Sequence, residues 1–297
     1  MVKETRLGHY VTRMIEEWKG IENKVKRSPS TPTGEKIEES CVLLLDVLEK
    51  AVCFTVSQAA FPLVWQTDLA AIDLENQRLP FPVMAIEYDF DYIWLQIPKI
   101  KMDKIQDLAY KRIIILVEIS ETQFALLSAY RPTLPVEGLT MEWATSPVAL
   151  VFDYAHLNTM DKWYVTNGDE IKIAIGGEGQ PRLKSSLPMY DEIIEEMAGD
   201  QLDILMKDMA DEMRMAFGML GILSCSNAPI EKIAPPAKLN KKRVKSGKTP
   251  IPTYRTLHVT DHTSRGSGKS TGTHASPRTH WRRGHIRKQP TAKGIIN

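Results

Sequence analysis

The segment 272–287 contains the side chains best suited to chemistry on a phosphate group. Its sequence, GTHASPRTHWRRGHIR, places histidines and arginines around one tryptophan. If the last seven residues form a strand, residues two apart share a face. Either face then combines an imidazole with a guanidinium. This combination has a binding and a catalytic interpretation.

In the binding interpretation, the arginine forks pair with phosphates, and the planar side chains stack on unpaired bases. The residues around the segment extend this set, because a basic run at 238–245 precedes it. The predicted partner is nucleic acid, with RNA favoured. The predicted contact residues are Lys241, Lys242, Arg243, Tyr254, Arg255, His274, Arg278, Trp281, Arg282, Arg283 and Arg287.

In the catalytic interpretation, His280 and His285 act as general base and acid on a ribose 2′-hydroxyl and the leaving 5′-oxygen. Arg282 or Arg283 then stabilises the charge that develops on phosphorus. This would make the protein a metal-independent endoribonuclease. The spacing alone does not place two imidazoles beside one phosphate. A disordered basic tail that binds polyanions without specificity is a further alternative.

We expect neither a metal nor a cofactor. His274, His280 and His285 have several arginines around them and no neighbouring thiolate or carboxylate, which disfavours a cation there. The stretch GSGKST at 266–271 ends like a phosphate loop, but Thr263 stands where the first glycine of that motif is required. We therefore reject ATP binding at this stretch.

The charge of the chain is divided between two parts. Residues 232–297 contain 16 Lys and Arg against one acid, Asp261, whereas residues 1–231 contain 22 bases and 36 acids. The formal charges are therefore about +15 for the tail and about −14 for the body. A basic tail on an acidic body indicates a polyanionic partner.

Two helices are expected at the N-terminus. Apolar residues recur at three- and four-residue steps over 6–26, and the sequence SPSTPTG at 28–34 ends this first helix. Residues 35–60 are apolar on nearly all sides and predict one second helix, which Pro62 terminates. The three cysteines, Cys41, Cys53 and Cys225, are expected to be reduced core thiols.

Short β-rich runs fill the middle of the chain. They lie at 82–90, 92–97, 112–119, 124–130, 141–154 and 162–175. Asn167-Gly168 separates two such runs and predicts a hairpin. Because no long helical pattern lies between the runs, an antiparallel sheet is favoured over a doubly wound one.

A long helix is expected from 190 to 223, where Gly199 permits a break. Its methionine stripe is expected in the core, although an adaptable groove for a partner helix is the alternative. The acidic positions are expected to form a solvated face. These positions are Asp191, Glu192, Glu195, Glu196, Asp200, Asp203, Asp208, Asp211 and Glu212.

The predicted fold class is α+β, with N-terminal helices, a mostly antiparallel sheet, a long acidic amphipathic helix and a small basic β module. The predicted boundaries are an acidic body at 1–228, a basic Pro-containing linker at 229–249 and the His/Arg-rich module at 250–297. No run reaches 18 apolar residues, and the N-terminus mixes charges too early for a secretory signal. We expect no membrane segment and a cytoplasmic location.

Two blocks carry a resemblance to a known group. The pattern HxSPRxHxRRGHxR within 272–288, together with RLPFPVMAIEYDF at 78–90, resembles uncharacterised proteins of tailed bacteriophages and prophages. The resemblance implies a phage origin and a role inside the infected bacterium. It implies no activity and assigns no residue a role.

Three hypotheses for function follow. The leading one is a phage accessory protein that binds nucleic acid through the basic module during host takeover or counter-defence. The second is the endoribonuclease. The third is an inhibitor that captures a host or defence protein through the methionine-rich helix or an acidic surface. The sequence decides neither whether the protein is an enzyme nor its oligomeric state.

Overall fold

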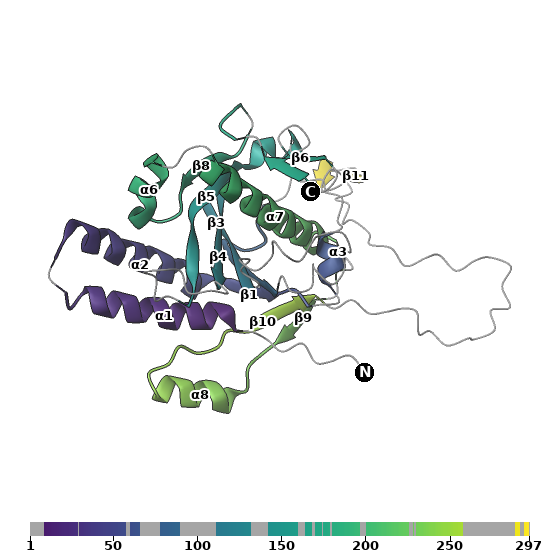
Figure 1. The fold of residues 1–297 in the computed structure, drawn as a ribbon. Coiled ribbons are helices and arrows are strands. Elements are labelled where there is room, and N and C mark those ends of the chain that lie inside the picture. The colour runs from purple at the N-terminus through teal and green to yellow at the C-terminus, as the bar shows by residue number, and fades with distance from the viewer. Residues whose placement is uncertain are drawn as a thin grey trace, which may run out of the picture.

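The computed structural model describes residues 9–28, 30–57, 60–65, 78–89, 111–131, 142–159, 164–167, 170–173, 175–178, 180–196, 200–225, 228, 230–257, 289–291 and 294–296. Figure 1 shows their arrangement. The helices are α1 (Tyr10–Val25), α2 (Pro32–Lys50), α3 (Phe61–Trp65), η3 (Tyr154–Thr159), η4 (Pro188–Tyr190), α6 (Asp191–Glu196), α7 (Asp200–Leu223) and α8 (Ala237–Lys245). The strands are β1 (Val52–Thr55), β2 (Val83–Asp89), β3 (Lys111–Ser120), β4 (Gln123–Arg131), β5 (Ala144–Asp153), β6 (Tyr164–Asn167), β7 (Glu170–Ile173), β8 (Arg182–Ser185), β9 (Ile230–Ile233), β10 (Tyr254–Leu257), β11 (Gln289–Thr291) and β12 (Gly294–Ile296).

One eight-stranded sheet organises the molecule. Its strand order is β8-β5-β4-β3-β2-β1-β10-β9. Strand β1 pairs in parallel with both β2 and β10, and the other pairs in this sheet are antiparallel. The predicted α+β class with N-terminal helices and a mostly antiparallel sheet is confirmed. The hairpin predicted at Asn167-Gly168 is also confirmed, because β6 and β7 pair antiparallel with Asn167 opposite Glu170.

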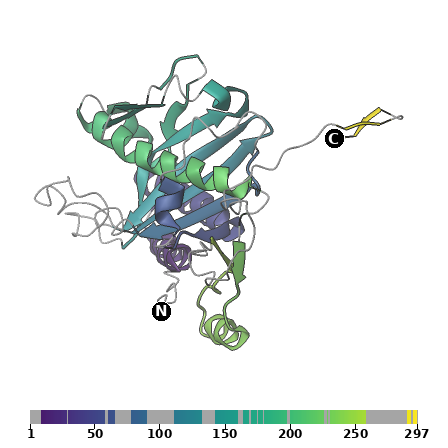
Figure 2. The same ribbon diagram turned by 90° about the vertical axis from the view of Figure 1, so that its right-hand side faces the viewer.

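Helices cover both faces of the sheet, as Figures 1 and 2 show. On β3, Ile113 and Ile115 belong to the core under α1 and α2, whereas Ile114 and Leu116 belong to the core under α3 and α7. Successive residues of a strand point to opposite faces. A strand buried on both faces therefore reads as a continuous apolar run, which explains the sequence RIIILV on β3.

The prediction of one helix over 35–60 is wrong at both ends. Helix α2 begins at Pro32, where the Thr31 hydroxyl accepts a hydrogen bond from the Gly34 amide at 3.0 Å. A threonine cap followed by proline is a strong helix start. The helix ends at Lys50, and the residues that follow form β1. Their β-branched and aromatic side chains suit a strand that pairs on both edges.

The helix predicted from 190 to 223 is divided into α6 and α7. The methionine stripe lies in the core as expected, since Met209, Met213, Met215 and Met219 are buried. The exposed face was predicted too broadly, because Glu212 is buried as well. Among the described helices, none combines the length and the apolar character needed to cross a bilayer.

One strand from the predicted linker and one from the start of the predicted module belong to the main sheet. Strand β9 and helix α8 lie within 229–249, and β10 inserts between β1 and β9. The strand expected at Tyr254 is confirmed, but its neighbours belong to the body. The second strand expected at 281–287 and the run at 92–97 lie outside the described residues.

Helix α7 crosses α3 so closely that Gly218 has no room for a side chain. A Cβ there would overlap the carbonyl oxygen of Val64. We expect Gly218→Ala to lower the free energy of unfolding by about 2 to 3 kcal/mol through overpacking. Gly20→Ala in α1 is the matched control, since nothing lies within 4 Å of that Cβ position. It is expected to gain about 0.5 to 1 kcal/mol. Equal urea-unfolding midpoints for the two variants would contradict the close packing.

Candidate interaction surfaces and buried polar centres

The residues predicted to bind nucleic acid separate into three groups. Lys241 and Lys242 are exposed on α8. Arg243, Tyr254 and Arg255 are held by contacts within the protein, as described below. The remainder lie outside the described residues, and their predicted roles stay predictions. These are His274, Arg278, Trp281, Arg282, Arg283 and Arg287. His280 and His285, predicted as catalytic, also lie outside the described residues, and so does the GSGKST stretch for which we reject ATP binding.

Tyr254 is buried and belongs to a group of hydrogen-bonded polar groups beneath α1. Its hydroxyl donates to Glu87 Oε1 at 2.6 Å, and the amide of Val11 donates to the same oxygen at 2.8 Å. Burial and then the negative charge of Glu87 raise the pKa of Tyr254, so the phenol stays a proton donor. Glu87 therefore joins β2, β10 and the first turn of α1. A base could stack on Tyr254 only if the sheet opened.

Arg255 is also occupied by the protein. Its guanidinium lies over the Phe81 ring at 4.7 Å from the centroid and over Phe54 at 5.8 Å. Such cation–π contacts stabilise a partly buried cation by about 0.5 to 2 kcal/mol. These ring contacts hold the Arg255 guanidinium against the protein, so it does not present a free fork to a phosphate.

Arg243 and Asn240 attach α8 to the body. Arg243 Nη2 lies 2.7 Å from Glu16 of α1, and its Nε donates to the Thr249 carbonyl at 2.8 Å. The Asn240 amide donates to the carbonyl of Ile251 at 2.8 Å and accepts from its N–H at 2.9 Å. These two residues, three apart on the helix, form the inward face of α8. The lysines of α8 are exposed.

His9 lies where α8 approaches the first turn of α1. It caps α1 with a left-handed backbone at φ 52°, and its ring centroid is 5.4 Å from that of Tyr254. Burial lowers the pKa of His9, and the positive charges of Arg243 and Arg13 lower it further. The imidazole is therefore neutral in the folded protein at neutral pH.

This lowered pKa predicts a loss of stability in acid. The unfolded chain binds the proton more readily, so the stability contribution is complete above the ordinary pKa of 6.5 and is lost as the pH falls from there to the lowered pKa of the folded state. We expect His9→Asn to flatten the pH dependence, because asparagine tolerates a left-handed N-cap. Urea midpoints at about pH 7.5 and about pH 5.5 measure the difference. His156→Asn at the exposed histidine of η3 is the control. An unchanged pH profile for His9→Asn would contradict this account.

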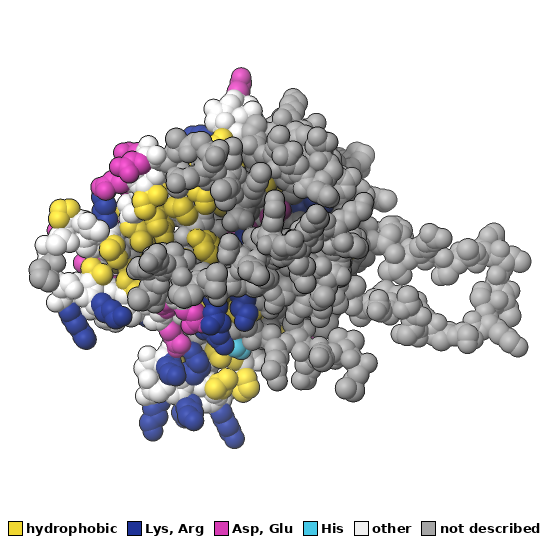
Figure 3. All heavy atoms as spheres, viewed as in Figure 1, with side chains coloured by type: hydrophobic (Ala, Val, Ile, Leu, Met, Phe, Trp, Pro, Cys, Tyr) yellow, Lys and Arg dark blue, Asp and Glu magenta, His cyan; other side chains and the backbone are white. Residues whose placement is uncertain are grey.

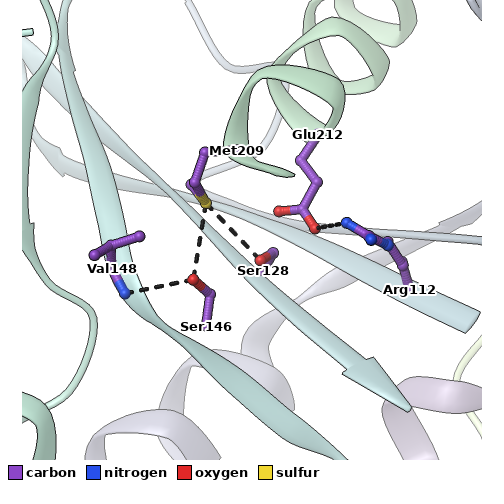
Figure 4. Close-up of polar contacts among 6 residues, drawn as sticks. All are labelled: Arg112, Ser128, Ser146, Val148, Met209 and Glu212. Atoms are coloured by element: carbon purple, nitrogen blue, oxygen red, sulfur yellow. Dashed lines mark hydrogen bonds and ion pairs between the residues drawn. The ribbon is translucent and has the colours of Figure 1, made fainter. Parts of the chain in front are cut away.

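A buried ion pair lies between the sheet and α7 (Figure 4). Arg112 Nη1 is 2.8 Å from Glu212 Oε1, and the two side chains are 4% and 1% exposed. Close by, the hydroxyls of Ser128 and Ser146 donate to the Met209 sulfur at 4.0 and 3.9 Å, where the β4–β5 pairing is irregular. This centre ties α7 to β3, β4 and β5, and it is shielded from solvent.

A different kind of surface covers α2 and α6. Two contacts hold α6 and η4 beside α2. Lys36 forms a salt bridge with Glu192 at 2.9 Å, and the Met189 amide donates a hydrogen bond to the Ser40 hydroxyl at 3.0 Å. We define the α2–α6 surface as the exposed side chains Glu35, Glu39, Val42, Leu43, Asp191, Ile193, Glu195 and Glu196. Figure 3 shows hydrophobic side chains gathered in this region, with acidic side chains on α6 beside them.

The α2–α6 surface is both acidic and apolar. Together, α2 and α6 carry nine carboxylates and two lysines, a formal charge of −7. Val42, Leu43 and Ile193 are 49%, 47% and 48% exposed. The apolar pattern of 35–60 predicts that Val42 and Leu43 are packed, but both side chains are about half exposed. The buried charges at Glu87, Arg112 and Glu212 are also absent from the predictions made from sequence.

The described residues include no group of three or more His, Cys, Asp or Glu arranged to hold a metal ion. None of the three cysteines forms a disulfide bond, and Cys41 and Cys53 are buried as expected. Burial raises the pKa of Cys41 to about 11 and that of Cys53 to about 12. Both thiols are therefore protonated at neutral pH and suit packing rather than nucleophilic chemistry.

Comparison with known proteins places this fold in a family. The family described as AcrVA2-like, anti-CRISPR type V subtype A2, matches residues 54–295. That range runs from β1 to β12 and includes α6, α7 and α8, whereas α1 and α2 precede it. No match was found among the curated proteins or among the solved structures. The match covers well over half of the chain, and the chain therefore belongs to the AcrVA2-like family of type V subtype A2 anti-CRISPR proteins.

Proposed function

We propose that this protein inhibits a type V CRISPR system inside the infected bacterium by binding one of its protein components through the α2–α6 surface. Membership of an anti-CRISPR family, over residues 54–295, supports a phage accessory protein with a counter-defence role, and this observation carries the proposal. Capture of a defence protein was the third hypothesis from the sequence, and the family favours it over host takeover.

The chemistry of the α2–α6 surface suits such a partner. An RNA-guided effector holds its nucleic acids in a positively charged channel. The five carboxylates of this surface make it complementary to a basic protein surface, which speeds encounter and excludes wrong partners. Exposed Val42, Leu43 and Ile193 supply apolar anchors that can be desolvated on binding. Acidic side chains around apolar anchors resemble the rim and core of a protein interface.

The two helices of this surface differ in their relation to the family. Helix α6 lies within the matched range, and α2 lies before it. The proposal therefore assigns the shared part of the interface to Ile193 and its acidic neighbours. Helix α2 extends it with Val42 and Leu43. Variants on the two helices separate these contributions.

The test of the function is protection of a targeted phage. Bacteria that carry a type V system with a matching guide are infected in the presence or absence of the protein. We expect plaques to reappear only when the protein is expressed. A strain with the same phage target but a CRISPR system of another type is the control, and it is expected to stay immune. Failure to protect against any type V system would overturn the proposal.

A second candidate function, binding of nucleic acid, is favoured by one observation on the described residues. Residues 234–249 contain six lysines and arginines and no acid, and they form α8 and its flanks. The endoribonuclease hypothesis rests on His280, His285, Arg282 and Arg283, which lie outside the described residues. It stays a prediction from the sequence.

A further inference from the structure

Helix α8 stands apart from the layered body, on the chain that connects β9 to β10 (Figures 1 and 2). None of its nine residues is buried. Lys238, Lys241, Lys242 and Lys245 are exposed, and their spacing of three, four and seven residues places them along one side of the helix. Figure 3 shows basic side chains pointing outward from this helix.

This arrangement is unfavourable for the isolated fold. Like charges three or four residues apart destabilise a helix by about 0.2 to 0.5 kcal/mol per pair. A helix of nine residues is marginal in water without packing. Since α8 contributes no buried side chain, core packing does not explain its lysines. An anionic ligand would offset the repulsion between them.

The inward contacts hold α8 ready for such a ligand. Asn240 bonds to both backbone groups of Ile251, and Arg243 bonds to Glu16 and Thr249. These bonds fix the orientation of the helix before any ligand arrives, which lowers the entropy cost of binding. Arg243 is therefore a positioning residue, although the sequence predicted it to contact the ligand.

The side chains on α8 identify the class of ligand. Lysine ammonium groups are point charges on flexible stems and bind phosphates without bidentate geometry. No aromatic residue lies in 237–245, so α8 offers no platform for stacking bases. Contacts of lysine to phosphate position a nucleic acid without reading its sequence. Seven residues of helix span about 10 Å, about three base-pair steps.

We infer that α8 binds the sugar-phosphate backbone of a nucleic acid through Lys238, Lys241, Lys242 and Lys245, with Asn240 and Arg243 positioning the helix. This inference rests on the second candidate function and is independent of the α2–α6 surface. RNA and DNA share the phosphate chemistry, and the experiment distinguishes them.

The experiment compares two full-length variants of equal charge. The α8 variant changes Lys238, Lys241, Lys242 and Lys245 to Gln, which keeps good helix formers. The matched control changes Lys24, Lys26, Lys50 and Lys184, which are exposed and lie outside α8, to Gln. Binding of labelled single-stranded RNA, duplex RNA and duplex DNA of equal length is measured by fluorescence anisotropy between about 50 and 200 mM salt.

We expect the α8 variant to bind at least about tenfold more weakly at low salt and its salt slope to fall by about 3, one unit or slightly less per lost contact. The control is expected to keep the wild-type slope. If both variants bind as the wild type does, the inference is wrong while nucleic-acid binding stands. If the wild type binds none of the three probes, both fall. Binding only to anionic phosphatidylglycerol vesicles would overturn the inference in favour of a membrane surface.

Discussion

Replacing Glu212 by Gln is expected to cost about 3 to 5 kcal/mol of stability, because it removes a buried carboxylate that pairs with the buried Arg112 guanidinium. The two side chains are 1% and 4% exposed and lie 2.8 Å apart. Water cannot solvate the charge that is left. The melting temperature should fall by roughly 10 °C for a chain of this size. Urea unfolding and thermal unfolding, each followed by circular dichroism, measure the loss.

The matched control is a second arginine–carboxylate pair on the same sheet. Arg131 lies 2.9 Å from Glu142, but these side chains are 39% and 45% exposed. Glu142→Gln should therefore cost less than about 1 kcal/mol. The double variant Arg112→Met with Glu212→Leu should be less destabilised than Glu212→Gln, since it removes both charges of the buried pair instead of one. Equal losses for Glu212→Gln and Glu142→Gln would contradict the buried ion pair.

Replacing Val42 and Leu43 together by Lys is expected to abolish protection against a type V system. The change removes two apolar anchors and adds two positive charges to an acidic surface. Two such contacts at an interface are worth about 3 kcal/mol, so the affinity for the partner should fall by about 100-fold or more. The plating of a targeted phage on bacteria that express the variant measures the effect.

The fold should tolerate this double change, because both side chains are about half exposed and lysine is a good helix former. Ile119→Lys on β3 is the matched control, since Ile119 is 53% exposed and lies outside the α2–α6 surface. It should keep full protection. Ile193→Lys on α6 should reduce protection if the matched part of the chain contributes to the interface. Full protection by Val42→Lys/Leu43→Lys at normal protein levels would remove α2 from the site.

The strands and helices with a strong hydrophobic period could be predicted from the sequence, and the same period could have located the buried charges Arg112 and Glu212. Arg112 is two residues from Ile114, so the alternation of a strand already places both on the face toward α7. Glu212 lies three residues after Met209 and four before Ala216, within the apolar stripe. The residue type alone predicts that Glu212 lies on the solvated face, whereas its side chain is buried. The position of Glu212 in the helical period indicates its burial better than its residue type does.

Other features depend on contacts that no local pattern encodes. The end of α2 at Lys50 follows from pairing of β1 with β2 and β10, and β10 lies about 200 residues further along the chain. Tyr254 begins a run that alternates as a strand does, and this pattern does not reveal that its hydroxyl bonds to Glu87, 167 residues away in the sequence. For the same reason, the sequence did not reveal that the strands β9 and β10 complete one edge of the main sheet. Most of the residues predicted for phosphate chemistry lie at 274–287, outside the described residues.

The most direct measurement of the central claim is the affinity of the purified full-length protein for the purified effector protein of a susceptible type V system. Biolayer interferometry is run with and without guide RNA, on the wild type, on Val42→Lys/Leu43→Lys and on the α8 variant. The account predicts saturable binding by the wild type, at least about 100-fold weaker binding by the α2 variant and near wild-type binding by the α8 variant. Equal affinity of the wild type and the α2 variant, or no binding by a wild-type protein that still protects phage, would contradict it.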